Sequence, residues 1–439
     1  MEPLMSRFGA TDSLRAAARD IRYRLQLAAD RRAVREFAAE MAGASSLRQT
    51  DFVLDGVAFQ SAAGIARVWA EVLPRWSASG FAERVTIMDR GATAPRYAGF
   101  QYVSAPVVRA ADSPMQTEAI NAVCSAVGAR AFASTLYTWT ALVPSVQSIY
   151  DMTPEVLGYD LDIPMWREKH AAIAAADSFV CISHSTDRDL REFLGGAAGA
   201  GGVTGAGGAS IGRERAGSSP IRTAHLGVAE PFGVLSEADA AAGADLTREL
   251  GLPERFYIFI GHRDAYKNAD LVFNAARQLI AAGDHEFGLL MLGGGPTLEP
   301  QFADVAGAIP VVVTRLDDNQ LKLAYGQAAA LLYTSRYEGF GLPILEAMAC
   351  GCPVVTCKNS SIPEVAGDAA VYVDVDDPAD LLRAMSYLAE PGVRDWWATA
   401  GFKQAAGFSW DDFPRAVAEA LEEVAAGAVR ATATQPTGT

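Results

Sequence analysis

The stretch that decides the fold runs from residue 335 to residue 355 and reads S-R-Y-E-G-F-G-L-P-I-L-E-A-M-A-C-G-C-P-V-V. It predicts the end of a β-strand, a loop that carries Gly339 and Gly341, and a helix that begins at Pro343, because proline is favoured in the first helical turn. Glycine lets a backbone approach a ligand closely and expose its N–H groups. A helix N-terminus behind such a loop favours a diphosphate.

Two glutamates flank this loop. Glu338 precedes it, so its carboxylate can face the hydroxyl groups of a ligand. Glu346 lies about one turn into the predicted helix, where it can accept two hydrogen bonds from vicinal hydroxyls. Two solvated acids that stabilise a helix dipole would have the same spacing. The residues alone therefore leave both interpretations open.

A second loop carries two cations. Residues 259–268 read F-I-G-H-R-D-A-Y-K-N, which predicts a strand that ends at Gly261, followed by Arg263 and Lys267 at the entrance to a helix. Two cations at this position can neutralise a diphosphate and stabilise the charge that develops on it as a bond breaks. A pair of surface cations is an equally good interpretation of the spacing alone.

Strands and helices alternate along most of the chain. Short apolar runs predict strands at 52–59, 85–88, 100–103, 131–134, 146–149, 178–182 and 221–226, then at 256–260, 287–292, 311–313, 330–333, 353–356 and 370–373. Helical segments lie between many of them, which is typical of parallel sheets covered on both faces. We therefore expect an α/β protein with two Rossmann-like domains that face a central cleft, since ligands bind beyond the carboxyl ends of such strands.

The composition places the domain boundaries. We expect an N-terminal helical extension at 1–50, an N-terminal Rossmann-like domain at 51–230, and a C-terminal Rossmann-like domain at 231–408. Residues 195–219 are nearly all Gly, Ala and Ser and predict a flexible loop. Residues 409–425 predict a helix that crosses back to the N-terminal domain, and 426–439 predict a disordered tail.

The predicted helix at 12–42 carries an apolar stripe flanked by arginines. The stripe consists of Leu14, Ala18, Ile21, Leu25 and Ala28. Such a helix can pack or form an oligomer, or it can lie on an anionic membrane. Acidic residues within it dilute the positive charge and favour the first interpretation.

The formal net charge of −15 argues against a nucleic-acid-binding role. We find no apolar run of 18 residues and no signal peptide, so we expect a cytoplasmic protein. Contact of residues 12–42 with the inner face of a membrane remains the alternative to a location free of the membrane.

The 335–355 stretch resembles the E-x7-E pattern of glycosyltransferase family 4, whose members are retaining enzymes with the GT-B fold. The resemblance implies that Glu338 binds donor-sugar hydroxyls and that Glu346 holds the ribose diol of the nucleotide. It also implies that the backbone of residues 340–342 (Phe340, Gly341 and Leu342) meets the sugar and phosphates. Residues 259–268 resemble the family's G-x-R…K-N element, which implies that Arg263 and Lys267, behind Gly261, clamp the donor diphosphate.

Weaker resemblances add four residues. Leu316 lies where the family's backbone contacts the nucleotide base, after a G-x-G-P-like turn at 293–296. Gly64 stands in place of the family's glycine-rich loop, although a tight strand-to-helix turn explains it equally well. Tyr150 and Asp151 begin a stretch that resembles the H-D-x-x-P-E element near the donor sugar. This chain has tyrosine where the family has histidine, and a phenol is a poor base at neutral pH.

The resemblance implies a retaining glycosyltransferase that moves a sugar, a hexose by expectation, from a nucleotide-diphosphate sugar to a hydroxyl of a glycan or lipid-linked acceptor. The setting expected from the family is polysaccharide or glycoconjugate assembly. We expect no metal and no cofactor, and we interpret the Asp160–Asp162 and Asp374–Asp376 pairs as surface acids. Two alternatives stay open: a non-catalytic sugar-nucleotide-binding or scaffold protein, and a nucleotide-sugar epimerase or hydrolase.

Overall fold

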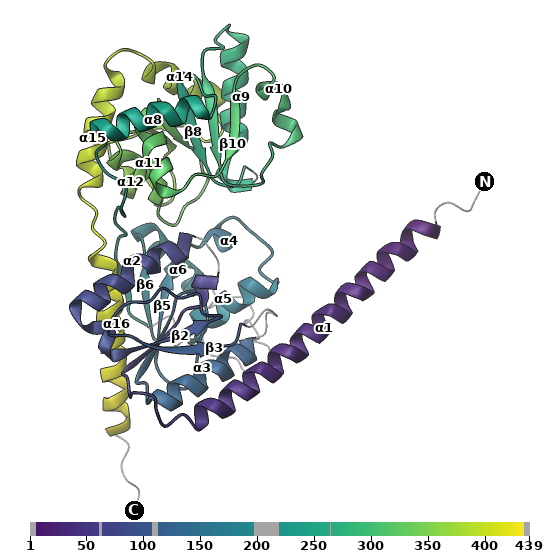
Figure 1. The fold of residues 1–439 in the computed structure, drawn as a ribbon, viewed down its shortest axis with the longest axis vertical. Helices are drawn as coiled ribbons and strands as arrows, with labels where there is room; N and C mark the ends of the chain where they lie inside the picture. Colours follow the sequence, from purple (N-terminus) through teal and green to yellow (C-terminus); the bar gives the residue numbers. More distant parts are fainter. Residues whose placement is uncertain (1–5, 61–63, 108–112, 197–218, 264, 434–439) are drawn as a thin grey trace, which may run out of the picture.

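The computed structural model describes residues 6–60, 64–107, 113–196, 219–263 and 265–433. Two domains lie one above the other, and a long helix projects from the lower one (Figure 1). Each domain is built around one parallel sheet. The predicted α/β architecture of two Rossmann-like domains with an N-terminal helix is confirmed.

The first sheet has the strand order β3-β2-β1-β4-β5-β6-β7. Its strands are β1 Phe52–Asp55, β2 Val85–Arg90, β3 Gln101–Ala105, β4 Ala131–Ser134, β5 Ser145–Ile149, β6 Ser178–Cys181 and β7 Ile221–Thr223. Phe52 and Leu54 of β1 pack toward α2 (Gly64–Ser79) and α16 (Asp412–Ala433), whereas Val53 packs toward α3 (Ser113–Val127). Both faces are buried, which is why these strands read as continuous apolar runs.

The second sheet has the order β10-β9-β8-β11-β12-β13. Its strands are β8 Phe256–Ile260, β9 Gly288–Leu292, β10 Val311–Thr314, β11 Ala330–Tyr333, β12 Val354–Cys357 and β13 Val371–Val373. In both sheets the strand order reverses beside the first strand, between β1 and β4 and between β8 and β11. Such a switch point is where open α/β sheets bind ligands.

Helices cover both sheets. The remaining ones are α4 Thr153–Val156, α5 Pro164–Ala175, α6 His184–Gly196, α8 Glu237–Glu249, α9 Ala269–Ala281, α10 Ala303–Ala306, α11 Asp318–Gln327, α12 Leu342–Ala349, α13 Ile362–Ala366, α14 Pro378–Leu388 and α15 Val393–Ala405. Short 3-10 turns lie at Val57–Gln60, Phe81–Arg84, Ala265–Lys267 and Pro300–Phe302. Helices α8 and α15 were not predicted from the sequence.

Helix α16 returns from the second domain to the first, where it packs on β4, β5, β6 and α2. Phe413 lies against Trp69, and Trp76 donates a hydrogen bond from its indole nitrogen to the Pro414 carbonyl (3.0 Å). The helix continues through Ala433, so the predicted start of a disordered tail at residue 426 is wrong. The buried stripe of this helix reaches Ala425, and the small residues that follow carry no turn signal that would end the helix there.

Helix α1 spans Ser6–Ala42, and Val34, Phe37 and Met41 near its end are buried against α3. Its beginning extends away from both domains (Figure 1). No helix in the described ranges has the length and hydrophobicity needed to cross a membrane. Of the predicted loop at 195–219, Gly195 and Gly196 end α6, Ser219 precedes β7, and 197–218 lie outside the described residues.

Candidate active site

The loop after β11 is held in place by the segment that follows β12. The Ser361 hydroxyl donates to the carbonyls of Glu338 and Phe340 (both 2.9 Å), and the Glu338 amide donates to the Ser360 hydroxyl (2.8 Å). Gly341 has a φ of 113°, which a residue with a side chain rarely adopts, and α12 begins directly after it. The loop therefore delivers Glu338 and the first amides of α12 to the same end of the sheet.

Lys267 and Glu338 form a close ion pair, with 2.5 Å between Nζ and Oε1. Both side chains are largely buried, and the ammonium also lies over the rings of Tyr266 and Tyr333. Burial lowers the pKa of Lys267, but the Glu338 carboxylate and the Tyr266 hydroxyl together outweigh it and the pKa is raised, so the lysine stays charged. Gly261 has a φ of 141°, which a residue with a side chain rarely adopts, and a Cβ there would lie 3.0 Å from the Lys267 side chain, so glycine suits this position.

Arg263 has a different environment from Lys267. Its side chain has no exposed surface, and it donates to the carbonyls of Gly293 (2.6 Å), Gly295 and Thr297 (both 2.8 Å). Its Nε donates to Glu299 (2.6 Å), and this hydrogen bond lowers the pKa of that carboxyl. Arg263 thus organises the turn after β9, and in this arrangement its guanidinium has no surface open to a diphosphate.

Glu346 is buried on α12 and reaches across to the first domain. Its Oε1 lies 2.9 Å from Nη2 of Arg67 on α2. Burial raises the pKa of Glu346 to about 7, and the Arg67 charge opposes part of this shift. The same Arg67 nitrogen lies 3.6 Å from Asp318, which makes Arg67 a bridge between the two domains. The sequence analysis did not identify Arg67, although its place three residues after Gly64 at the start of a helix was a usable signal.

Gly339 brings the backbones of the two domains into close contact. A Cβ at this position would lie 1.8 Å from the Tyr150 carbonyl oxygen, so only glycine fits. The Gly339 carbonyl accepts hydrogen bonds from the hydroxyls of Ser183 (2.7 Å) and Thr186 (3.1 Å). The neighbouring Tyr337 hydroxyl donates to Asp189 (2.6 Å). The Glu338 loop is therefore fixed from both domains.

Tyr150 does not present its hydroxyl to a ligand. The side chain is buried, its oxygen accepts a hydrogen bond from Trp69 Nε1 (2.5 Å), and it donates to the Thr135 carbonyl (3.0 Å). Burial raises the pKa of the phenol, which keeps it protonated. The expectation of a side-chain contact from Tyr150 to donor or acceptor is thus not supported. Asp151 is partly exposed, and its Oδ1 accepts from the Thr153 amide (3.0 Å).

The other predicted residues lie outside the Lys267–Glu338 pair. Phe340 is buried against the rings of His225 and Phe408, and Leu316 is partly buried in the loop after β10. Gly64 begins α2, and a Cβ there would meet no atom within 4 Å, so local packing does not explain this glycine. The two pairs of aspartates lie in exposed turns, where Asp376 pairs with Arg336.

A cluster of His184, His225 and Glu364 also joins the domains, and its potential ligand atoms lie within 4.8 Å of one another. Glu364 already accepts from the amides of His184 (2.8 Å) and Ser185 (3.3 Å) and pairs with His225 (2.5 Å). Its carboxylate therefore caps α6 across the domain interface.

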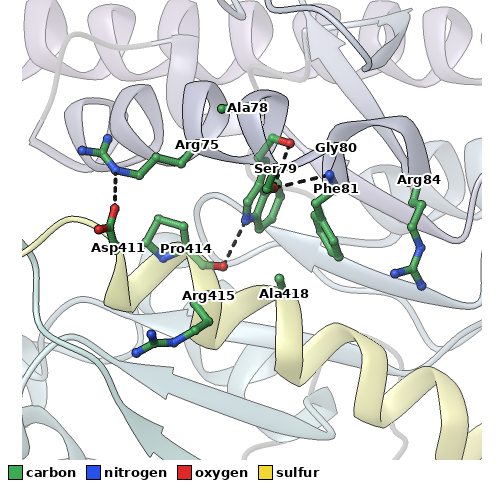
Figure 2. A pocket seen from close by; sticks show the side chains of 11 residues that line it. Arg75, Ala78, Ser79, Gly80, Phe81, Arg84, Asp411, Pro414, Arg415 and Ala418 are labelled. Carbon is green, nitrogen blue, oxygen red and sulfur yellow. Dashed lines mark hydrogen bonds and ion pairs between the residues drawn. The ribbon is translucent and has the colours of Figure 1, made fainter.

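A groove of about 750 Å³ lies between α2 and α16 (Figure 2). Three arginines line it, but each is paired with acids: Arg75 with Glu71 and Asp411, Arg84 with Asp51 and Glu422, and Arg415 with Asp412. None of the predicted site residues contributes to this groove. Its position separates it from the Lys267–Glu338 site.

Comparisons with known proteins give the sequence and fold similarities of the chain. Residues 254–390 match the family model of glycosyl transferases group 1. A stretch of 99 residues is 46% identical to O-antigen chain mannosyltransferase B of Escherichia coli, covering 22% of this chain and 25% of that protein. The chain spans between a quarter and just under half of the length of the first curated relatives that it matches.

Solved glycosyltransferase structures share the fold. WaaG, a glycosyltransferase involved in lipopolysaccharide biosynthesis, aligns with a TM-score of 0.61 at 15% identity, over 84% of this chain and 99% of WaaG. HepE of Anabaena in complex with UDP and glucose aligns with a TM-score of 0.60 at 14% identity, over 85% of this chain and all of HepE. The chain thus has the GT-B fold, and residues 254–390 within its carboxyl-terminal domain match the group 1 glycosyltransferase model.

Proposed function

We propose that this chain is a retaining glycosyltransferase that moves a sugar from a nucleotide-diphosphate sugar to a hydroxyl acceptor. The single observation that carries the proposal is the buried Lys267–Glu338 pair beside the first turn of α12. A fixed cation and a helix N-terminus lie at the same edge of the sheet. Their positive charge complements the negative charge of a departing diphosphate.

Each residue has a separate task in this proposal. Lys267 and the first amides of α12 stabilise the charge that grows on the diphosphate as the glycosidic bond breaks. Glu338 accepts hydrogen bonds from the hydroxyls of the donor sugar, and Glu346 accepts those of the ribose. The acceptor hydroxyl attacks from the face that the leaving group vacates, and a phosphate oxygen of the leaving group takes its proton. The proposed mechanism uses no metal ion.

Domain contact supports the exclusion of water from an activated donor. Gly339 touches the first domain through its backbone, and Tyr337 binds Asp189 beside it. A closed arrangement around the reacting groups favours transfer to a bound acceptor over hydrolysis. The O-antigen chain mannosyltransferase and WaaG, a glycosyltransferase involved in lipopolysaccharide biosynthesis, are consistent with an acceptor in glycoconjugate assembly. The glucose in the HepE complex is consistent with a hexose as the donor sugar.

The test uses the full chain with GDP-mannose, UDP-glucose, UDP-N-acetylglucosamine and related donors. Thermal stabilisation reports binding, and slow release of the nucleoside diphosphate reports turnover. We expect one donor to stabilise the chain and to be consumed, with the effect lost in Lys267→Ala and Glu338→Ala. Binding without consumption in the presence of glycan and lipid-linked acceptors would favour a scaffold, and an isomerised sugar would favour an epimerase. Absence of any nucleotide binding would overturn the proposal.

A further inference from the structure

Arg67 is a cation of the first domain that reaches the binding elements of the second. It lies in the first turn of α2, directly beyond the carboxyl end of β1 and its following turn. Its side chain is 41% exposed, although Nη2 contacts the almost fully buried Glu346 carboxylate at 2.9 Å. Within the described ranges, Nη2 is the only nitrogen of this guanidinium with a protein acceptor. The rest of its donors are therefore available.

The two arginines near the proposed donor site differ in this respect. Arg263 uses Nε, Nη1 and Nη2 on protein acceptors and has no exposed side-chain surface. Arg67 keeps most of its hydrogen-bonding capacity and much of its surface. A planar guanidinium with free donors binds phosphate oxygens in bidentate fashion. The arginine able to meet a diphosphate is hence Arg67.

We propose that Arg67, which pairs with Glu346, is a donor-binding residue that turns to the donor diphosphate when a nucleotide binds. This inference rests on the proposed function, in which the ribose hydroxyls bind Glu346. Those hydroxyls supply the carboxylate with new hydrogen bonds, so Arg67 can leave without stranding a buried charge. Its new partner carries more negative charge than Glu346.

The movement of Arg67 from Glu346 to the diphosphate would link donor binding to the relative position of the two domains. Arg67 belongs to the first domain and Glu346 to the second, and Asp318 at the start of α11 lies 3.6 Å from the same guanidinium nitrogen. A nucleotide held by the second domain would then attract Arg67, and with it α2, through its diphosphate. The donor itself thereby stabilises the closed arrangement.

The experiment compares a nucleoside with its diphosphate, uridine with UDP and guanosine with GDP, by isothermal titration calorimetry on the full chain. The readout is the ratio of the two dissociation constants in wild type, Arg67→Ala, Arg67→Lys and Arg75→Ala. Arg75 is a matched control because it lies on the same helix and pairs with Glu71 and Asp411 at the distant groove.

We expect Arg67→Ala to reduce the preference for the diphosphate about 10- to 100-fold, the effect of losing hydrogen bonds to a charged group. Nucleoside affinity should stay equal or increase because Glu346 is released. Arg67→Lys should retain part of the preference, and Arg75→Ala all of it. Melting temperatures of the variants confirm that they are folded.

An unchanged ratio in Arg67→Ala, or an equal loss in Arg75→Ala, would overturn this inference and leave the proposed function intact. An equal tightening of nucleoside and diphosphate in Arg67→Ala would also overturn it, since Arg67 would then only block the ribose site. A wild-type chain that binds neither nucleoside nor diphosphate would instead refute the proposed function, and this inference with it.

Discussion

The two sides of the proposed cleft are built in different ways. On the second domain, the loop before α12 and the loop after β8 bring Glu338 and Lys267 together within one domain. On the first domain, Arg67 and the Tyr150 backbone contribute through contacts with the opposite domain. The second side was recognised from its sequence because each of its two loops is a contiguous motif, although Lys267 and Glu338 lie 71 residues apart. The first side depends on partners that lie 279 residues away in the case of Arg67 and Glu346.

The largest expected effect tests the local side. Lys267→Ala should reduce the release of nucleoside diphosphate from the sugar donor about 100- to 1,000-fold, the usual effect of removing one preorganised group that stabilises a leaving charge. Lys358→Ala is the control, because Lys358 is an exposed lysine of the same domain. A reduction smaller than threefold for Lys267→Ala would show that this lysine does not stabilise the leaving diphosphate.

The next effect tests how the two sides meet. Gly339→Ala should reduce turnover by about 100-fold, because its Cβ would lie 1.8 Å from the Tyr150 carbonyl and displace the Glu338 loop. Small-angle scattering should show a larger radius of gyration as the domains separate. Gly233→Ala is the matched control, since a Cβ there meets no atom within 4 Å. A variant with wild-type rate and radius would disprove the close contact.

Arg263→Ala contrasts with the lysine in the same loop. We expect the free energy of unfolding to decrease by about 2–4 kcal/mol, because three carbonyls and Glu299 lose a buried partner. Chemical denaturation measures this change, and the remaining folded fraction should keep more activity than Lys267→Ala. If the variant is as stable as wild type but inactive, Arg263 acts on the donor as the family resemblance implies.

The pH dependence of stability tests the interface carboxylate. Burial raises the pKa of Glu346 from its ordinary 4.5 to about 7, so the folded protein holds this proton where the unfolded chain has lost it. Glu346 therefore stabilises the fold most below pH 4.5, and this contribution is lost as the pH rises to 7. The loss is of order 3 kcal/mol, at about 1.36 kcal/mol per pKa unit.

Glu346→Gln cannot ionise and should lack this decline. Its denaturation midpoint should rise relative to wild type between pH 4.5 and 7.5 and then stay constant. Parallel profiles for the two proteins would show that the carboxyl has an ordinary pKa.

The smallest effect concerns Tyr150 on the first side. Tyr150→Phe should cost about 1 kcal/mol of stability, the usual value of a buried hydrogen bond, because Trp69 Nε1 loses its acceptor. Turnover should stay within twofold of wild type, since the hydroxyl faces Trp69 and the Thr135 carbonyl. A large decrease in turnover with unchanged stability would show that the Tyr150 hydroxyl acts on the donor or the acceptor.

The sequence by itself determined the parallel sheets, the order of the two domains and the loops that end β8 and β11. Apolar runs, glycines with unusual backbone angles and a proline in the first turn of α12 act over a few residues, so their consequences can be read locally. The match of the Glu338 loop to a known pattern added the expected chemistry. Helices α8 and α15 were missed, although α8 begins with a capping box formed by Ser236 and Asp239.

Only the tertiary structure decided the partner of each side chain. Arg263 and Lys267 are four residues apart in similar sequence surroundings, yet one is enclosed by the turn after β9 and the other pairs with Glu338. The same holds for Arg67 at the start of α2. Its partner, Glu346, lies on the opposite domain and could not be identified from the sequence around Arg67. The charge of a side chain can be read from the sequence. Its burial and its partner depend on which distant segments fold against it.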